Sequence, residues 1–386
     1  MNKFKKIIFL SLALIFVLLL GLEISGYEYI LKAAQVIYPQ GHITAFIDDA
    51  RFFPVRKIKN GQVWEWPQHK NYNKVPPTER LAKEHEKMKT VAFLIIKNDS
   101  IFSENYYKGY HKDSLSNSFS MAKSMTEALL GKAIKDGYIK WNDKVKKYIP
   151  GLKGKYADEL TVEDVATMSS GSNWVENYYN PFKITTEAYF TGDIDKMMLD
   201  KVRIENKPGE KFEYLSGDTQ LLGMIITAAT GKNLSDYMSE NFWIPMGARK
   251  YGLWTLDKPG GMEKAFCCIH SNARDFARFG KLYAHQGNWE GKQILDSAYV
   301  EKSLSPRLTT APYYGYSWWL ANYKGKKISY MRGVLGQYVI IIPEDHIIIV
   351  RLGEKRDKNL KGKHHPQDFY LYIDEAYKML KKSGDI

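Results

Sequence analysis

A basic cluster and a long apolar run open the chain. Lys3, Lys5 and Lys6 precede an almost unbroken apolar stretch from Ile7 to Leu22. This order is typical of an export segment. The following Ile24-Ser25-Gly26 has a bulky Ile where cleavage favours a small residue, so we expect the segment to be retained as a membrane anchor. The lysines then favour a cytoplasmic N-terminus and a body on the periplasmic or cell-surface side.

Cleavage of this segment is the alternative, because the apolar run is short for a full membrane span, which needs about 20 apolar residues. Beyond it, residues 34–84 are rich in proline, aromatic and basic residues and show no sustained period. The pattern therefore predicts an anchor over 1–33, a linker that wraps onto the body over 34–84, and a folded domain over 85–386.

Within the folded domain the first clear signals are a hairpin and a helix. The β-rich runs 91–96 and 101–110 flank a polar Asn-Asp turn, which predicts two antiparallel strands. From Ser120 to Asp136 apolar residues recur at helical spacing, and Gly137 suits a helix C-terminus. The helix is expected to begin almost at Ser120.

The rest of the domain has a helical middle and a strand-rich end. Helical patterns and turn clusters dominate 143–256, and strands are expected over 316–320, 337–342 and 346–352. Residues 367–381 form an amphipathic helical pattern. Strands at both ends of a helical region predict an α+β fold, with one antiparallel sheet flanked by helices and completed by the C-terminus, plus a largely helical lobe.

Composition narrows the class of protein. The chain has 386 residues, is 44% hydrophobic and 14% aromatic, and so lacks the polar bias of disorder. Its net charge of +13 comes from scattered lysines without a nucleic-acid-binding motif, which favours proximity to anionic lipid or cell-wall polymer over nucleic acid. Cys267 and Cys268 are adjacent and are interpreted as small core residues, because neighbouring cysteines do not easily bridge each other.

Ser120 and Lys123 form the first candidate for chemistry. Positions i and i+3 share a helix face, so the lysine amine can lie beside the serine hydroxyl. A desolvated lysine loses its proton more readily and could then accept the serine proton. Backbone N–H groups at the helix N-terminus could stabilise an oxyanion. The alternative is a solvated Ser and Lys at an ordinary helix start.

The order of further motifs favours the catalytic interpretation. The chain carries Thr161-Val162-Glu163-Asp164-Val165-Ala166-Thr167-Met168-Ser169-Ser170-Gly171, then Pro208-Gly209-Glu210-Lys211-Phe212-Glu213-Tyr214-Leu215-Ser216, His270-Ser271-Asn272-Ala273-Arg274-Asp275-Phe276-Ala277-Arg278-Phe279-Gly280, and Tyr314-Gly315-Tyr316-Ser317-Trp318-Trp319. These segments resemble, in this order, motifs of the β-lactamase-related family. That family includes class C β-lactamases, D-Ala-D-Ala carboxypeptidases, esterases and 6-aminohexanoate-dimer hydrolase.

The resemblance implies roles for several residues. Tyr214 would relay a proton with Lys123. Ser216 stands where the family has Asn, a departure that argues against a dedicated β-lactamase. Trp174-Val175-Glu176-Asn177-Tyr178 resembles a segment of the aminohexanoate-type branch in which the tyrosine reaches the substrate, which makes Tyr178 a candidate contact.

The family's Lys/His-Thr-Gly element aligns with Met331-Arg332-Gly333. Arg332 could replace the missing cation if its side chain points inward, and a backbone N–H near Leu335 would be the second oxyanion donor. Together with Ser216, Gly333 and Tyr178, these residues make up the expected substrate site.

We therefore expect a β-lactamase/transpeptidase-like fold and a serine hydrolase that cleaves an ester, amide or peptide through an acyl-enzyme on Ser120. No metal-ligand cluster or nucleotide motif appears, so no cofactor is expected. Two alternatives remain open. The protein could be a penicillin-binding-type sensor that is acylated but deacylated slowly or not at all, or an exported scaffold.

Overall fold

A six-stranded antiparallel sheet forms the centre of the protein. The computed structural model describes residues 3–359 and 362–386, and the strand order is β3-β2-β12-β11-β10-β9. The strands are β2 (Thr90–Lys97), β3 (Ser100–Tyr106), β9 (Trp319–Tyr323), β10 (Lys326–Gly333), β11 (Gln337–Ile342) and β12 (Ile347–Gly353). Pairing of β2 with β12 joins the two ends of the domain, as the pattern of strands predicted.

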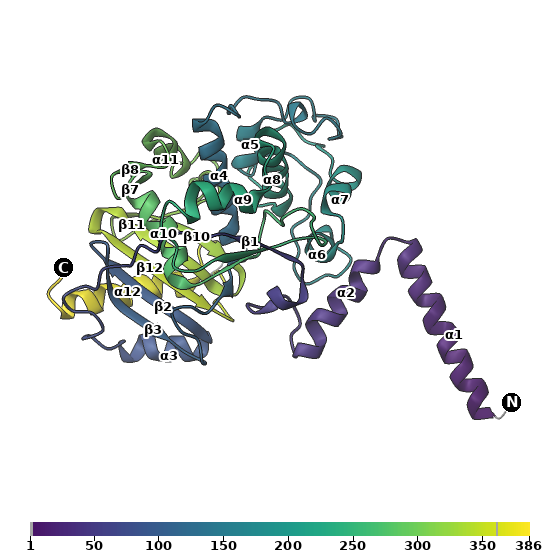
Figure 1. The fold of residues 1–386 in the computed structure, drawn as a ribbon, viewed down its shortest axis with the longest axis horizontal. Helices are drawn as coiled ribbons and strands as arrows, with labels where there is room; N and C mark the ends of the chain where they lie inside the picture. Colours follow the sequence, from purple (N-terminus) through teal and green to yellow (C-terminus); the bar gives the residue numbers. More distant parts are fainter. Residues whose placement is uncertain (1–2, 360–361) are drawn as a thin grey trace.

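Helices cover both faces of this sheet, which explains why its inner strands are buried throughout instead of alternating. On one face lie α3 (Glu79–Lys87) and the predicted C-terminal helix α12 (Gln367–Lys382). On the other lie α4 (Met121–Lys135) and α10 (Ala273–Ala284) (Figure 1). The α+β prediction is confirmed.

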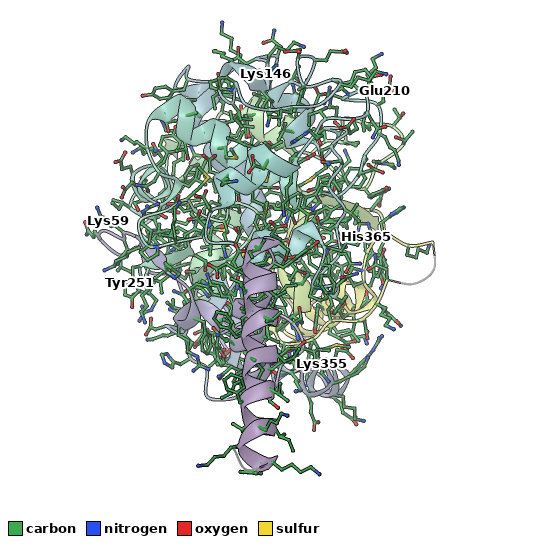
Figure 2. The ribbon with its side chains drawn as sticks, turned by 90° about the vertical axis from the view of Figure 1, so that its right-hand side faces the viewer. Lys59, Lys146, Glu210, Tyr251, Lys355 and His365 are labelled. Atoms are coloured by element: carbon green, nitrogen blue, oxygen red, sulfur yellow. A yellow bond between two sulfur atoms is a disulfide. The ribbon has the colours of Figure 1, made fainter. Side chains whose placement is uncertain are left out.

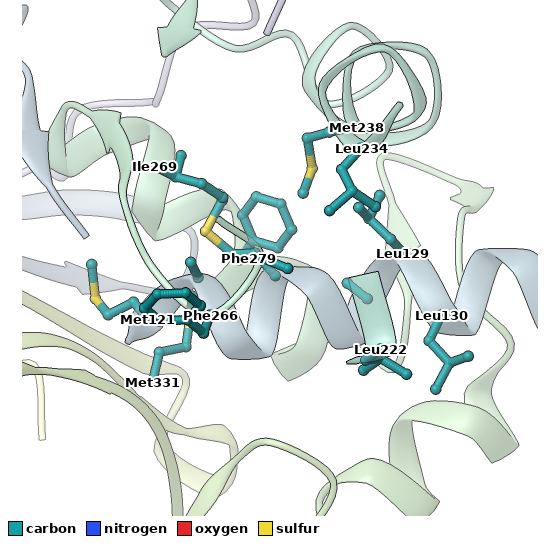
Figure 3. Packing of buried hydrophobic residues seen from close by; sticks show 14 of the residues in the cluster. Met121, Leu129, Leu130, Leu222, Leu234, Met238, Phe266, Ile269, Phe279 and Met331 are labelled. Atoms are coloured by element: carbon teal, nitrogen blue, oxygen red, sulfur yellow. The ribbon is translucent and has the colours of Figure 1, made fainter. Parts of the chain in front are cut away.

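A helical lobe sits beside the sheet and packs on α4 (Figure 1). Its helices are α5 (Val162–Ala166), α6 (Ile184–Phe190), α7 (Ile194–Lys201), α8 (Ser216–Thr230) and α9 (Leu234–Met238). Figure 3 shows the shared core, in which Leu129 of α4, Leu222 of α8 and Met331 of β10 belong to one cluster of buried side chains. The helix α4, which begins directly after Ser120, thus lies between the central sheet and the helical lobe.

A second, smaller sheet was not predicted from the sequence. Its order is β1-β5-β6-β4, formed by β1 (Val55–Ile58), β5 (Gly252–Thr255), β6 (Ile269–Ser271) and β4 (Ser116–Asn117). The strand β1 comes from the 34–84 segment, which therefore contributes to folded structure as it crosses the body. Further elements are the hairpin β7 (Asn288–Trp289) and β8 (Lys292–Gln293) and the helix α11 (Ser297–Ser303).

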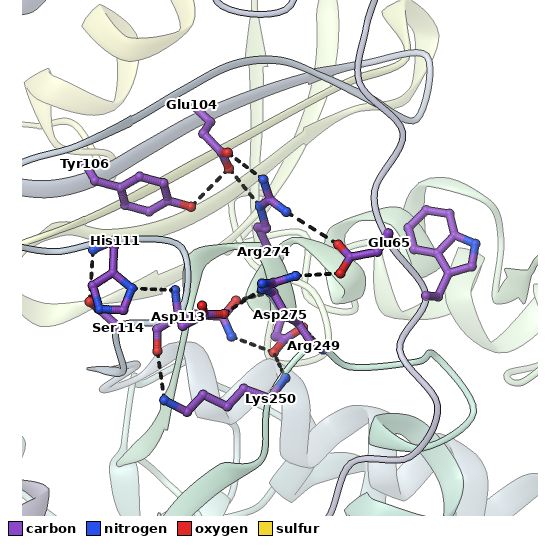
Figure 4. Close-up of polar contacts among 12 residues, drawn as sticks. Glu65, Glu104, Tyr106, His111, Asp113, Ser114, Arg249, Lys250, Arg274 and Asp275 are labelled. Atoms are coloured by element: carbon purple, nitrogen blue, oxygen red, sulfur yellow. Dashed lines mark hydrogen bonds and ion pairs between the residues drawn. The ribbon is translucent and has the colours of Figure 1, made fainter.

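A buried ion pair ties α10 to the central sheet. The Arg274 guanidinium donates to both carboxylate oxygens of Glu104 on β3, at 2.8 and 2.5 Å (Figure 4). Arg274 also lies 3.6 Å from Glu65 in the segment before the domain. The two parallel bonds to Glu104 fix the direction as well as the distance of the contact.

The N-terminus consists of two helices of different character. The helix α1 (Lys3–Ile24) is long and apolar enough to cross a membrane, and none of its most apolar stretch is buried against the rest of the protein. It projects away from the body, and Figure 2 views the molecule from the side on which α1 leaves. The next helix, α2 (Glu28–Ile37), instead packs against α6.

One predicted strand begins too early. The expected strand over 316–320 starts only at Trp319, as β9. Ser317 has a positive φ of 57°, which breaks the extended conformation, and its carbonyl accepts a 2.6 Å hydrogen bond from Ser124 of α4. The contact with the helix overrides the local strand propensity.

Candidate active site

Ser120 lies at the N-terminus of α4, where a tight turn presents it. The preceding Phe119 has a φ of 44°, which is uncommon for a bulky residue, and its N–H is held at 2.8 Å by the Asn117 side chain of β4. Among the described residues, the Ser120 N–H has no backbone partner, whereas the next three N–H groups are bonded. A free N–H at this position can donate to a developing oxyanion.

Lys123 is buried and directed at Ser120. Its Nζ lies 3.0 Å from Ser120 Oγ, 3.1 Å from Ser216 Oγ and 2.9 Å from the carbonyl oxygen of Phe266. Three acceptors match the three donors of an ammonium group. The predicted pairing of serine and lysine is therefore present, and the sequence alternative of a solvated pair does not describe this site.

Glu176 completes a chain of contacts that sequence reasoning did not find. Its Oε1 accepts from Ser216 Oγ and its Oε2 from Ser216 N–H, each at 2.7 Å. Trp174 Nε1 donates to Oε2 at 2.9 Å. The only sequence signal for Glu176 was its position within the 174–178 segment, from which Tyr178 was predicted as the substrate contact. Hydrogen bonds thus link the Glu176 carboxylate through the Ser216 hydroxyl and the Lys123 amine to Ser120.

Trp174 can occupy its position because the facing residue of α8 is a glycine. A Cβ on Gly217 would lie 2.5 Å from Cε3 of the Trp174 indole. Trp174 is buried, and its indole N–H holds the Glu176 carboxylate at the N-terminus of α8. Glycine at position 217 therefore leaves the space that Trp174 needs to hold Glu176 in the site.

Tyr214 lies beside Lys123 through its ring. The Lys123 Nζ is 5.1 Å from the centroid of the Tyr214 ring, within the range of a cation–π contact. The ring also packs on Trp319 and Tyr314, with centroids 5.4 and 6.0 Å apart. Among the described residues, no hydrogen bond joins Tyr214 to Ser120 or Lys123. Its position is compatible with the proton role that the family resemblance implies.

A cavity of about 440 Å³ opens at the nucleophile, and this volume is typical of small-molecule sites. Ser120, Ser216, Tyr178 and Leu335 all line it. Tyr178 is 36% exposed, yet burial of its hydroxyl end, together with the nearby Glu176 carboxylate, raises the pKa of this phenol well above its usual value. The phenol is therefore a neutral hydrogen-bond donor in the lining of the cavity.

The end of β10 approaches the nucleophile through backbone. A Cβ on Gly333 would lie 2.3 Å from the carbonyl oxygen of Ser118, so the close contact requires glycine. Leu335, in the short 3-10 turn that follows, has a φ of 61°. Both residues adjoin the Ser120 loop, which suits the predicted second backbone donor.

Arg332 is close to the site but does not line the cavity. Its guanidinium stacks 3.3 Å from the Trp319 ring centroid, and its Nη1 donates to the His364 carbonyl at 3.0 Å. The neighbouring Met331 points into the core with α4 (Figure 3). The guanidinium and the Tyr214 ring therefore both pack on the indole of Trp319.

Both cysteines are buried in the core as predicted, but the expectation that they do not bridge is wrong, because Cys267 and Cys268 form a disulfide with Cα atoms 3.7 Å apart. The backbone of Cys268 has a φ of 73°, so the two side chains do not alternate as in an extended strand. Cys267 lines the cavity and directly follows Phe266, the carbonyl acceptor of Lys123. The disulfide is thus part of the wall of the site.

Comparison with known proteins places this geometry in a family. The Beta-lactamase family profile matches residues 78–367. The chain is 25% identical over 304 residues to 6-aminohexanoate-dimer hydrolase of Paenarthrobacter ureafaciens, covering 73% of this chain and 77% of that protein. It is 30% identical over 132 residues to a protein named as a D-alanyl-D-alanine carboxypeptidase candidate in Escherichia coli, covering 32% and 30% of the two chains.

Solved structures agree on the fold. A candidate 6-aminohexanoate-dimer hydrolase from Bacillus anthracis superimposes with a TM-score of 0.70 at 20% identity, over 93% of this chain and 95% of that one. The octameric penicillin-binding protein homologue from Pyrococcus abyssi gives 0.57 at 19% identity, over 79% and 76%. The profile covers most of the chain, and we conclude that this protein belongs to the Beta-lactamase family and is a serine hydrolase.

Proposed function

We propose that Ser120 attacks the carbonyl of an ester or amide, forms an acyl-enzyme and is released by water. The observation that carries this proposal is the 3.0 Å contact between Lys123 Nζ and Ser120 Oγ at the start of α4. The Ser120 N–H and a backbone N–H near Leu335 would stabilise the oxyanion. The Gly333 contact with Ser118 supports this arrangement because it brings the two backbones together.

Lys123 must lose a proton before it can accept one from Ser120. The chain of contacts supplies a route, because Ser216 Oγ both accepts from Lys123 and donates to Glu176. A proton that moves from Lys123 to the Ser216 oxygen, while the Ser216 proton moves to the Glu176 carboxylate, leaves a neutral amine beside Ser120. Tyr214 would then act with Lys123 when the leaving group takes up a proton.

Labelling with a fluorophosphonate tests the nucleophile. The adduct is expected on Ser120, and Ser120→Ala should abolish it, while the exposed Ser305→Ala serves as the matched control. An adduct on Ser118 or Ser124 would contradict the assignment. Labelling of Ser120 without turnover of any ester or amide would favour the alternative of a slowly deacylating sensor.

The substrate class can be narrowed with the same protein. Ser216 and Met331 replace groups that β-lactamases of this family use, so short-chain p-nitrophenyl esters should be hydrolysed faster than a chromogenic cephalosporin. A higher kcat/KM for the cephalosporin than for the esters would reverse this part of the proposal. The similarity to 6-aminohexanoate-dimer hydrolase adds short amides as a second group to screen.

We also propose that α1 anchors the protein with its basic N-terminus in the cytoplasm and its body outside. The length and apolar character of α1 support this, together with the three lysines that precede its apolar run. N-terminal sequencing of the membrane-bound protein should find the apolar segment intact. A mature chain that begins between Gly26 and Lys32 would show cleavage and a soluble product instead.

A further inference from the structure

The helix α2 carries two adjoining apolar faces, and Ala33 belongs to both, because it is buried against the body and also lines the cavity. Tyr29, Ala33 and Val36 are buried against the body, and Tyr29 donates a 3.0 Å hydrogen bond to the Pro181 carbonyl. This contact fixes α2 on the lobe that contains α6. The helix α2 is therefore packed onto the folded body, although it directly follows the apolar N-terminal segment.

The second face of α2 forms a wall of the cavity at Ser120. Ile30, Ala34 and Ile37 follow at i, i+4 and i+7, so they lie on one side of the helix, and all three line the cavity. The nearby Ile43 and Ala45 extend the same wall. The side of the cavity formed by α2 is thus apolar, whereas the rest of the lining includes Ser120 and the charged residues Glu354, Lys355 and Arg356.

The dimensions of this apolar side suit a chain of medium length. Seven residues of helix separate Ile30 from Ile37, which corresponds to about 10 Å of rise. An extended octanoyl chain has a similar length, because carbon–carbon bonds are about 1.5 Å long. The three α2 side chains carry no charge, so they would bind such a chain through burial of apolar surface.

The chain is expected on the acyl side of the scissile bond. Tyr214, which the proposed function places at the leaving group, does not line this cavity, whereas Ser120 and Ser216 do. A substrate with its leaving group toward Tyr214 therefore has its acyl part toward α2. We propose that the preferred substrates are esters or amides of medium-chain apolar acids, an inference that rests on the proposed acylation of Ser120.

A chain-length series with the full-length protein tests this inference. From p-nitrophenyl acetate through butyrate to octanoate, each kept below its micellar concentration, kcat/KM should rise by up to about fourfold for each methylene that enters the cavity. Hexyl acetate moves the chain to the alcohol side and should show no gain over ethyl acetate. An equal gain with alkyl acetates would overturn the acyl-side assignment.

Variants of α2 separate binding in the cavity from general affinity for apolar esters. Ala34→Trp fills the space beside α2 and should lower the ratio of kcat/KM for octanoate to kcat/KM for acetate at least tenfold. Gln35→Trp is the matched control, because Gln35 is the exposed neighbour outside the cavity. If Ala34→Trp also lost acetate turnover through misfolding, the smaller Ala34→Leu should still reduce octanoate selectively.

The outcomes distinguish the two proposals. Acetate hydrolysis without a chain-length gain, or with a gain that Ala34→Trp leaves intact, overturns the medium-chain inference and leaves the nucleophile in place. Failure of every ester, together with failure of Ser120 labelling, overturns the proposed function and this inference with it.

Discussion

Replacing Glu176 with Gln removes one charge from the chain of contacts behind Lys123 and keeps its shape. The carboxylate accepts three hydrogen bonds, two at Oε2 from Ser216 N–H and Trp174 Nε1, and one at Oε1 from Ser216 Oγ. An amide oxygen in the Oε2 position keeps the first two. The amide nitrogen then faces Ser216 Oγ and cannot accept, so the hydroxyl loses the group to which it donates.

The smallest expected effect follows from that one lost bond. A hydrogen bond to a charged group contributes about 1.5 to 3 kcal/mol, and about 1.4 kcal/mol corresponds to a factor of ten in rate. Because a glutamine amide also cannot take up the proton that the proposed route delivers to Glu176, the lost bond sets a lower bound, and kcat/KM for p-nitrophenyl acetate should decrease at least about tenfold in Glu176→Gln. The rate of fluorophosphonate labelling should fall in parallel, since labelling uses the same step.

The control and the coupling experiment separate positioning from folding. Glu205→Gln makes the same charge change at an exposed residue of the same lobe and should leave kcat/KM unchanged. Ser216→Ala breaks the chain at its middle, so the double variant with Glu176→Gln should be little worse than the poorer single variant. A Glu176→Gln enzyme within threefold of wild type would refute the reasoning. A loss that matches the unfolded fraction in urea would reduce Glu176 to a structural residue.

Three further outcomes are expected. Lys123→Ala and Tyr214→Phe should each lower turnover about 10² to 10⁴-fold, and the double variant little further, because they act as one proton relay; near wild-type turnover in Tyr214→Phe would exclude the phenol from the mechanism. Burial raises the pKa of Asp218 to about 8, so the folded state keeps a proton that the unfolded state releases near pH 4, and the free energy of unfolding should fall between about pH 4 and 8. The free energy of unfolding, measured by urea titration, should fall by at most roughly 6 kcal/mol across that window, and Asp218→Asn should abolish this fall. An identical pH dependence in the two proteins would contradict the assignment. Finally, thiol titration of the unfolded, unreduced chain should find no thiol, and two after reduction, because Cys267 is bonded to Cys268.

The sequence by itself determined the elements whose cause is local. The hairpin of β2 and β3, the helix α4 and the helix α12 follow from side-chain periodicity and turn residues, and all three are present in the structure. The pairing of Ser120 with Lys123 was equally predictable, since helix geometry alone places positions i and i+3 side by side.

Tertiary structure decided whatever depends on segments that are distant in the chain. Glu176 reaches Ser216 across 40 residues, and apart from its place in the 174–178 segment nothing in the local sequence distinguishes it from a solvated glutamate. The strand β1 owes its conformation to pairing with β5, and the bond between Cys267 and Cys268 depends on a left-handed turn in the loop before β6. The wall that α2 gives the cavity has the same origin. Periodicity shows which face of a helix is apolar, but only packing of the whole chain settles whether that face is covered by the core or borders the nucleophile.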